Sequence, residues 1–353
     1  MPEPWRRGGP AAHSRARRAR PAGHLGLALF LWAGVAACSG DAGRGSEPTG
    51  VPAAAVDVRI PEGAGARAIA TRLAESGLVR HPRWFGLYLR FKGATRELQA
   101  GHYRLPANAD WGEIVRALRT GDVVTVPLTI PEGFTLREIA PRVAALTGAA
   151  EDSVLRRMRD TALARALGAP GPTLEGYLFP ETYRFAERAA LDDVLATMVR
   201  RYQAFWGAAE RRRADSLALS ERQVVTLASI VEKEARRADE RPIIAGVYLN
   251  RLRRGMLLQA DPTVQFALGE TRAHLLYRDI DRVADNPYNT YTHGGLPPGP
   301  IASPGEASLR ATLQPARVPY LFFVARPDGS HIFSISEREH INAKNRVRRR
   351  RGP

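Results

Sequence analysis

The feature that most constrains the fold of this 353-residue chain is a six-residue pattern that occurs twice. Residues 58–63 read Val-Arg-Ile-Pro-Glu-Gly, and residues 128–133 read Leu-Thr-Ile-Pro-Glu-Gly. Proline removes a backbone donor and glycine tolerates turn conformations, so each pattern is expected to end a strand. Apolar residues at helical spacing follow each copy. They are Ile69, Leu73 and Leu78, and then Leu136, Ile139, Val143 and Leu146. The repeat therefore predicts two units of strand, turn and amphipathic helix.

Between the copies, the pattern favours a strand at 101–105, a helix at 111–118 and a strand at 123–130. We therefore predict a small, partly duplicated α+β module over residues 56–148. Its strand-helix pattern is similar to LysM-like domains. Both carbohydrate binding and a purely structural role are open for it.

The chain beyond residue 151 is predicted to be mainly helical, with helices at 156–167, 191–206, 221–237 and 240–254. It then turns Gly- and Pro-rich and ends in two strands, 320–325 and 331–335, joined by an Asp328-Gly329 turn. The predicted fold class is thus α+β: a small LysM-like strand-helix module, then a mainly helical domain with C-terminal strands over residues 149–343.

The net charge of +16 comes mostly from the two ends of the chain. Residues 1–24 carry six Arg and one Glu, and the basic tail 344–353 carries one Lys and five Arg. Such tails are either solvated or attracted to anionic lipid headgroups. Nucleic-acid binding is disfavoured, because the body has neither zinc-finger spacing nor an aromatic-basic recognition motif.

The N-terminus has the layout of a signal or anchor segment. After the basic stretch 1–24, the apolar run within residues 25–38 is shorter than the ~20 residues that a spanning helix needs. It ends in Val-Ala-Ala-Cys38, which resembles a bacterial lipoprotein processing site, and Cys38 is the only cysteine. The alternative is an uncleaved anchor with a buried thiol. With a linker at 39–55, both readings place the later residues outside the cytoplasm and tethered to a membrane.

The helix predicted at 221–237 carries a glutamate on its apolar face. Glu234 shares this face with Leu227, Ile230 and Val231. Glu232 lies about 200° around the helix and is expected to pair with Arg236 on the surface. Burial raises the pKa of a carboxyl group, and a protonated carboxyl can act as the general acid that glycosidic cleavage needs. The alternative is a buried glutamate paired with an arginine.

Six motifs in a fixed order add a family resemblance. They are LEGYLFPETY at 174–183, ASIVEKE at 228–234, GVYLNRL at 246–252, LQADPTV at 258–264, YNTY at 288–291 and GLPPGPI at 295–301. Together, over roughly residues 58–341, the chain resembles the YceG/MltG family of endolytic murein transglycosylases. In that family the second glutamate of the IVEKE run is catalytic, which implies Glu234 here.

The resemblance implies lytic cleavage between N-acetylmuramic acid and N-acetylglucosamine in peptidoglycan glycan strands. One glutamate protonates the leaving oxygen and then acts as the base, while the muramic acid C6 hydroxyl closes a 1,6-anhydro ring. No metal or other cofactor is expected. Endolytic cuts would limit the length of nascent strands, and peptidoglycan synthases are further candidate partners. The implied location is the cell (inner) membrane, lipid-anchored or single-pass, with the catalytic domain on the periplasmic or extracytoplasmic side.

Other motif residues are candidates for substrate binding. Polar side chains that could hydrogen-bond sugar groups are Glu175, Gln259, Asp261 and Asn289, and aromatic side chains that could pack on sugar faces are Tyr177, Tyr288 and Tyr291. Each of them could equally be a cap, a turn former or a core residue, and Asp261 is also a candidate N-cap for a helix at 262–268. The Pro-rich segment 294–305 is predicted to be either a stiff wall of a cleft or a structural loop.

Two other functions stay open at this point. A non-catalytic peptidoglycan-binding scaffold would not need Glu234. A hydrolase that uses water would need a second carboxylate near Glu234, and Glu175 or Asp261 could serve. The short apolar segment and the Arg-rich C-terminus both depart from the family pattern.

Overall fold

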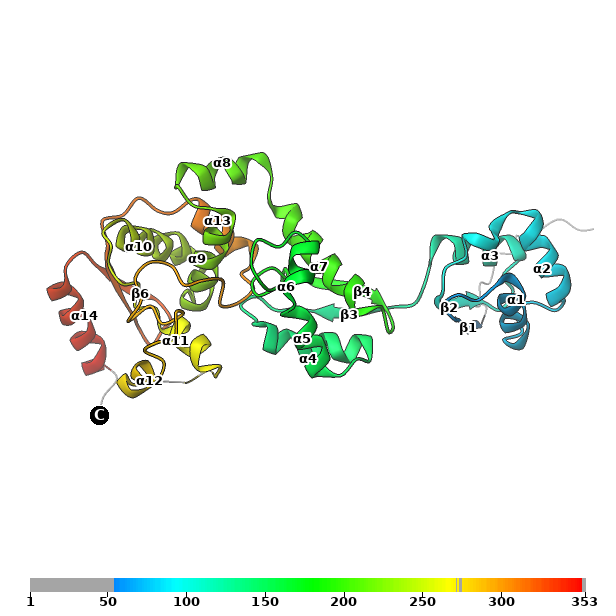
Figure 1. Ribbon diagram of the computed structural model, residues 1–353, viewed down its shortest axis with the longest axis horizontal. Coiled ribbons are helices and arrows are strands. Elements are labelled where there is room, and N and C mark those ends of the chain that lie inside the picture. Colours follow the sequence, from blue (N-terminus) through cyan, green and yellow to red (C-terminus); the bar gives the residue numbers. More distant parts are fainter. Residues whose placement is uncertain (1–53, 271, 273–274, 351–353) are drawn as a thin grey trace, which may run out of the picture. The chain divides into compact units, whose positions relative to one another are not determined.

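The computed structural model describes residues 54–270, 272 and 275–350, as a mixture of helices and small antiparallel sheets. Figure 1 shows these elements in chain order. The predicted α+β class is confirmed. Cys38 and the segment 25–38 lie outside the described residues. Within the described ranges, no helix is long and apolar enough to cross a membrane.

The first copy of the repeat folds around its own core. β1 (Ala55–Ile60) pairs antiparallel with β2 (Gly101–Pro106), with Val58 opposite Tyr103. Helices α1 (Ala66–Glu75), α2 (Pro82–Phe91) and α3 (Trp111–Thr120) cover this pair, and a short 3-10 turn, Ala94–Arg96, follows α2. The sequence analysis missed α2, although it starts at a proline suited to a first turn.

The second copy has a different partner. β3 (Thr125–Thr129) pairs antiparallel with β4 (Thr182–Ala186), and α4 (Leu136–Thr147) packs in a second core with α5 (Glu151–Met158), α6 (Thr161–Ala166) and α7 (Leu191–Phe205). The two copies within the predicted 56–148 module therefore lie in different cores. The helix predicted at 156–167 is split, because Asp160 caps α6 by accepting from the Ala162 N–H (2.8 Å).

The second half is organised around α9 (Glu221–Glu234). This helix packs against α8 (Ala208–Ser216), α10 (Arg241–Arg253), α11 (Asp261–Leu268) and α13 (Glu306–Leu313). The sequence predicted one apolar face for this helix. In the structure every residue from 224 to 231 is buried, so this part of the helix is enclosed on all sides. The helix ends at Glu234 rather than at 237, because a 3-10 turn, Ala238–Glu240, leads into α10.

The C-terminal part contains the predicted hairpin and an additional helix. β5 (Phe322–Ala325) and β6 (His331–Ser334) pair antiparallel, as expected, and α12 (Tyr277–Arg282) is a short helix earlier in the chain. The basic tail does not begin as a loose extension at residue 344. It continues α14 (Glu337–Arg350), which is fixed by the buried side chains of Ala343 and Val347.

The interior of α10 generates a stability prediction at Gly246. A Cβ atom there would lie 2.5 Å from the Ala316 carbonyl oxygen and 3.2 Å from Val318 Cγ2. Because a backbone oxygen cannot move aside cheaply, Gly246→Ala should lower the free energy of unfolding by about 1–3 kcal/mol. The matched control is Gly86→Ala, also inside a helix but with open space around it. It should be neutral or stabilising by up to about 1 kcal/mol. Calorimetry that found an unchanged Gly246→Ala transition would contradict the close contact.

Candidate active site

Glu234 is the last residue of α9, and its half-buried side chain faces α10. The Tyr248 hydroxyl on α10 donates to Glu234 Oε1 over 2.9 Å. In the described part of the chain this is the only hydrogen bond to that carboxyl group, so Oε2 is left for another partner.

The surroundings of Glu234 favour its neutral form. Burial is the main cause, and the negative charge of Asp261 adds to it; together they raise the pKa of Glu234 to about 7. The hydrogen bond from Tyr248 and the positive charge of Arg251 act in the opposite direction. A carboxyl group with a pKa near neutrality can both give and take a proton at pH 7.

Tyr248 and Arg251 are site residues that the sequence analysis missed. Both lie in the GVYLNRL motif, and the signal was the placement of Arg251 on the otherwise apolar face of α10. Its buried guanidinium donates to the carbonyl oxygens of Leu321 (2.6 Å) and Leu258 (2.8 Å). Burial lowers the pKa of Arg251 from its usual range. These carbonyl contacts hold a positive charge at a fixed position near Glu234.

Two further predicted residues join this group. Asp261 is the first residue of α11 rather than its N-cap, which is Ala260, and its carboxylate accepts from the Tyr291 hydroxyl. Gln259 has the left-handed φ of 49°, a conformation that non-glycine residues adopt at a cost, and its Oε1 lies 3.4 Å from Arg251 Nη1. The structure thus brings Glu234, Gln259, Asp261 and Tyr291 together.

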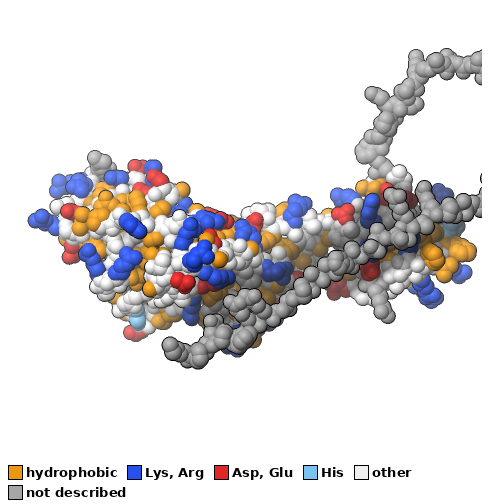
Figure 2. All heavy atoms as spheres, turned by 90° about the horizontal axis from the view of Figure 1, so that it is seen from above, with side chains coloured by type: hydrophobic (Ala, Val, Ile, Leu, Met, Phe, Trp, Pro, Cys, Tyr) orange, Lys and Arg blue, Asp and Glu red, His pale blue; other side chains and the backbone are white. Residues whose placement is uncertain are grey.

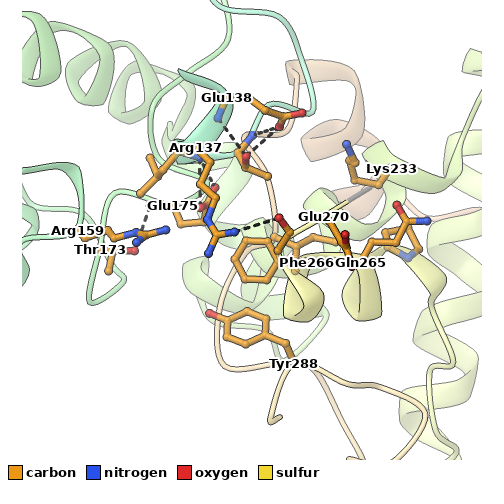
Figure 3. Close-up of a pocket in the computed structure, with 15 residues that line it drawn as sticks. Arg137, Glu138, Arg159, Thr173, Glu175, Lys233, Gln265, Phe266, Glu270 and Tyr288 are labelled. Carbon is orange, nitrogen blue, oxygen red and sulfur yellow. Dashed lines mark hydrogen bonds between the residues drawn. The ribbon is translucent and has the colours of Figure 1, made fainter. Parts of the chain in front are cut away.

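A cleft of about 490 Å³ adjoins this group. Figure 3 shows Glu175, Lys233, Phe266 and Tyr288 among the residues that line it. The Phe266 and Tyr288 rings are 4.8 Å apart between centroids and form one aromatic surface. Ile301 of the Pro-rich segment also lines the cleft, so this segment does contribute to its wall.

Two pairs of chain neighbours join the cleft to Glu234. Lys233 lines the cleft and directly precedes Glu234, and Pro262 lines it and directly follows Asp261. The cleft therefore runs along the chain segments that carry Glu234 and Asp261, although these two side chains are not among those that line it.

The Glu175 side chain lies at the N-terminal end of α4, where its carboxyl group accepts a hydrogen bond from the Leu136 N–H at 3.1 Å. This hydrogen bond lowers the pKa of Glu175, but the stronger effect of burial raises it to about 8. Glu175 is therefore a carboxyl group of the cleft lining that, like Glu234 outside it, favours its protonated form near neutral pH.

The pairing predicted for Glu232 is wrong. Its side chain is only 7% exposed, and it pairs with Arg241 (3.3 Å) rather than Arg236. The other carboxylate oxygen accepts from the Gly305 N–H (3.0 Å). The reason is that Glu232 faces α10 and the start of α13, where Arg241 and the Gly305 N–H reach its two carboxylate oxygens. Glu232 therefore joins α9, α10 and the start of α13.

Two predicted substrate contacts are buried in the interior. Tyr177 is completely buried in the second core, against Tyr202. Asn289 is also completely buried, and its amide donates to the carbonyl oxygens of Ile280 and Val283 while its oxygen accepts from the Tyr291 N–H. Both side chains are in contact with protein on all sides, so the structure corrects their placement to the interior. Through its side-chain oxygen, Asn289 fixes the backbone of Tyr291.

No cluster of three or more potential metal ligands occurs within residues 54–350 as far as they are described. The polar groups around Glu234 are one carboxylate, one guanidinium, one amide and two phenols, which are suited to proton transfer and hydrogen bonding.

Comparisons with known proteins place the chain in a family. A model of the YceG-like family matches residues 58–346. A Bacillus subtilis (strain 168) protein named endolytic murein transglycosylase is 33% identical over 305 residues, covering 82% of this chain and 84% of that protein. A Streptococcus pneumoniae (strain ATCC BAA-255 / R6) protein of the same name is 31% identical over 330 residues, covering 82% of this chain but only 59% of the longer relative.

A solved structure shares the fold. The 2.6 Å crystal structure of a yceG-like protein from Listeria monocytogenes is 34% identical to this chain, with a TM-score of 0.57. The match covers 82% of this chain and 98% of that structure.

The opposing influences on Glu234 give a pH prediction. Tyr248→Phe removes a hydrogen bond that favours the carboxylate, so the pKa of Glu234 should rise above about 7. Asp261→Asn removes a negative charge, so the same pKa should fall. Carbon-13 NMR titration of labelled glutamate carboxyls, assigned by the signal lost in Glu234→Gln, measures both. Shifts in the same direction would contradict the described electrostatics.

Proposed function

Because the chain belongs to the YceG-like family, we propose that it is an endolytic murein transglycosylase with Glu234 as its catalytic acid and base. The observation that carries this proposal is a half-buried glutamate beside a cleft, with its pKa raised to about 7. The name of the Bacillus subtilis relative, aligned over most of both chains, supports peptidoglycan as the substrate.

The proposed reaction uses Glu234 twice. In the protonated form, Oε2–H donates its proton to the glycosidic oxygen while Oε1 accepts from Tyr248. The bond between muramic acid C1 and that oxygen breaks, and the N-acetylglucosamine side leaves with a new hydroxyl group. The carboxylate then takes the proton of the muramic acid C6 hydroxyl, whose oxygen attacks C1 and closes the 1,6-anhydro ring. Glu234 ends protonated, and no water is consumed.

The neighbours of Glu234 suit these two states. Burial and Asp261 favour the acid before cleavage, while Tyr248 and Arg251 stabilise the carboxylate formed afterwards. A pKa near 7 keeps both forms accessible, which is the condition under which one group serves well as acid and as base. The intramolecular hydroxyl also removes the need for a second carboxylate that would position water.

The cleft supplies surfaces suited to a glycan strand. The Phe266–Tyr288 aromatic surface is proposed to pack on a sugar ring, and Glu175 to hydrogen-bond a hydroxyl or acetamido group. Gln259, which accepts from Arg251, and Tyr291, which donates to Asp261, are proposed to orient the strand at Glu234. Cuts within nascent strands would limit their length close to the synthases that make them.

Product analysis tests the chemistry. The full chain in detergent is incubated with purified glycan strands, and the products are identified by mass spectrometry. Wild type should leave 1,6-anhydro-muramic acid ends, and Glu234→Gln should reduce the rate by about 10²–10⁴-fold, as expected for loss of a general acid.

Glu232→Gln is the matched control in the same motif. It weakens the pair with Arg241, so stability should fall by about 1–3 kcal/mol while anhydro ends are still formed. Reducing ends from wild type would instead indicate a hydrolase, with Asp261 or Glu175 as its second carboxylate. Strand binding without any cleavage would favour the scaffold.

We also propose that residues 25–38 hold the chain in the cell membrane, with the cleft on the extracytoplasmic side. The support is the order of basic stretch, apolar run and Cys38. Growth with an alkyne fatty acid should label the wild-type chain but not Cys38→Ser. An unlabelled chain that stays in the membrane fraction would indicate a single-pass anchor, and a wholly soluble chain would contradict the anchoring.

A further inference from the structure

One face of α2 in the first module is apolar but has no partner in the fold. Trp84, Leu87 and Phe91 are 65%, 55% and 87% exposed. Their spacing of three and four residues places them on one side of the helix. The opposite side of α2 packs into the module core through Phe85 and Leu89, which are completely buried. The exposed apolar side is therefore not needed to hold the helix in the fold.

Cations surround this apolar face, and the nearby carboxylate of Glu97 is already paired with Arg119. Residues 76–96 contain no Asp, Glu, Asn or Gln. Arg80, Arg83, Arg90 and Lys92 are all exposed, and within the described part of the chain none of them forms an ion pair with a carboxylate. Hydrophobic and basic side chains are close together on the face that Figure 2 shows of the first module.

We propose that α2 is a membrane-docking helix, which lies in the headgroup layer of an anionic lipid bilayer. Trp84, Leu87 and Phe91 would enter the boundary between headgroups and acyl chains, where tryptophan is favoured. Arg83 and Arg90 would contact lipid phosphates. Ten residues of helix span only about 15 Å, so the helix lies along the surface and does not cross it.

The local chemistry favours lipid over the other possible occupants. A sugar-binding surface needs free carboxylate or amide groups that hydrogen-bond hydroxyls. Residues 76–96 have none, and the neighbouring Glu97 carboxylate is paired with Arg119. A second copy of α2 would bring the same cations against each other. An anionic lipid surface complements both the apolar face and its charges.

The length of chain before β1 is compatible with this docking. If residue 38 is held at a membrane, the predicted linker 39–55 spans at most about 60 Å when fully extended. The first module would then remain close to the same bilayer. The docking is independent of the transglycosylase reaction, so either proposal can fail alone.

Fluorescence quenching by brominated lipids tests the proposal. The full chain carries Trp5→Phe and Trp32→Phe, which leaves Trp84, Trp111 and Trp206. It is reconstituted in nanodiscs of phosphatidylcholine alone or mixed with phosphatidylglycerol, with and without bromine on the acyl chains. The quenching due to Trp84 is the part that disappears in Trp84→Phe.

Trp84 should be quenched in the phosphatidylglycerol discs and much less in the uncharged discs. Arg83→Gln and Arg90→Gln should each lower the ratio of docked to free helix by about fivefold. Tyr277→Ser, an equally exposed site on α12, is the control and should change nothing. Circular dichroism verifies that each variant is folded.

Three results would overturn the proposal. Equal quenching in charged and uncharged discs would remove the role of the arginines. A Trp84 signal that ignores bromine but responds to added glycan strands would indicate a sugar platform. Crosslinking between Trp84→Cys chains in a Cys38→Ser background, without lipid quenching, would indicate a dimer face.

Discussion

Burial of α9 on all sides is the constraint on which the rest of the structure depends. The helix has α8, α10, α11 and α13 around it, and its polar residues are satisfied internally. Ser229, for example, accepts from the Ile301 N–H at 3.0 Å and so fixes the Pro-rich segment against the helix. A helix enclosed in this way can present a carboxyl group to a ligand only where it ends, and it ends at Glu234. The site is therefore held by the core and not by a loop.

The second copy of the repeat has become part of the site. Its Pro-Glu-Gly turn lies against α9, because the Lys233 ammonium donates to the Gly133 carbonyl oxygen (3.2 Å). The helix that follows this turn, α4, offers the Leu136 N–H to Glu175 and lines the cleft. The first copy keeps its own core and leaves the outer face of α2 free. One local pattern thus supports two roles, depending on which strand it pairs with.

Two carboxyl groups of the same motif illustrate how surroundings decide chemistry. Glu232 has Arg241 and the Gly305 N–H as partners, so both of its oxygens are occupied and it joins three helices. Glu234 has one phenol on one oxygen and a negative neighbour in Asp261. The first arrangement stabilises a charge for structure, and the second keeps a proton available for transfer.

The sequence by itself determined the local units and nominated Glu234 as the proposed catalytic carboxyl group. Periodicity and turn residues predicted β1, β2, α3, β3, α4 and the C-terminal hairpin, because these depend on neighbours along the chain. Helical spacing placed Glu234 on an apolar face, and the family resemblance implied its catalytic role. Only the tertiary structure decided which strand pairs with β3 and that Glu232 binds Arg241. It also decided that Tyr177 and Asn289 are interior. The positions of Tyr248 and Arg251 near Glu234 were likewise visible only in the structure. Each of these depends on contacts between residues far apart in the chain, and neither spacing nor composition carries that information.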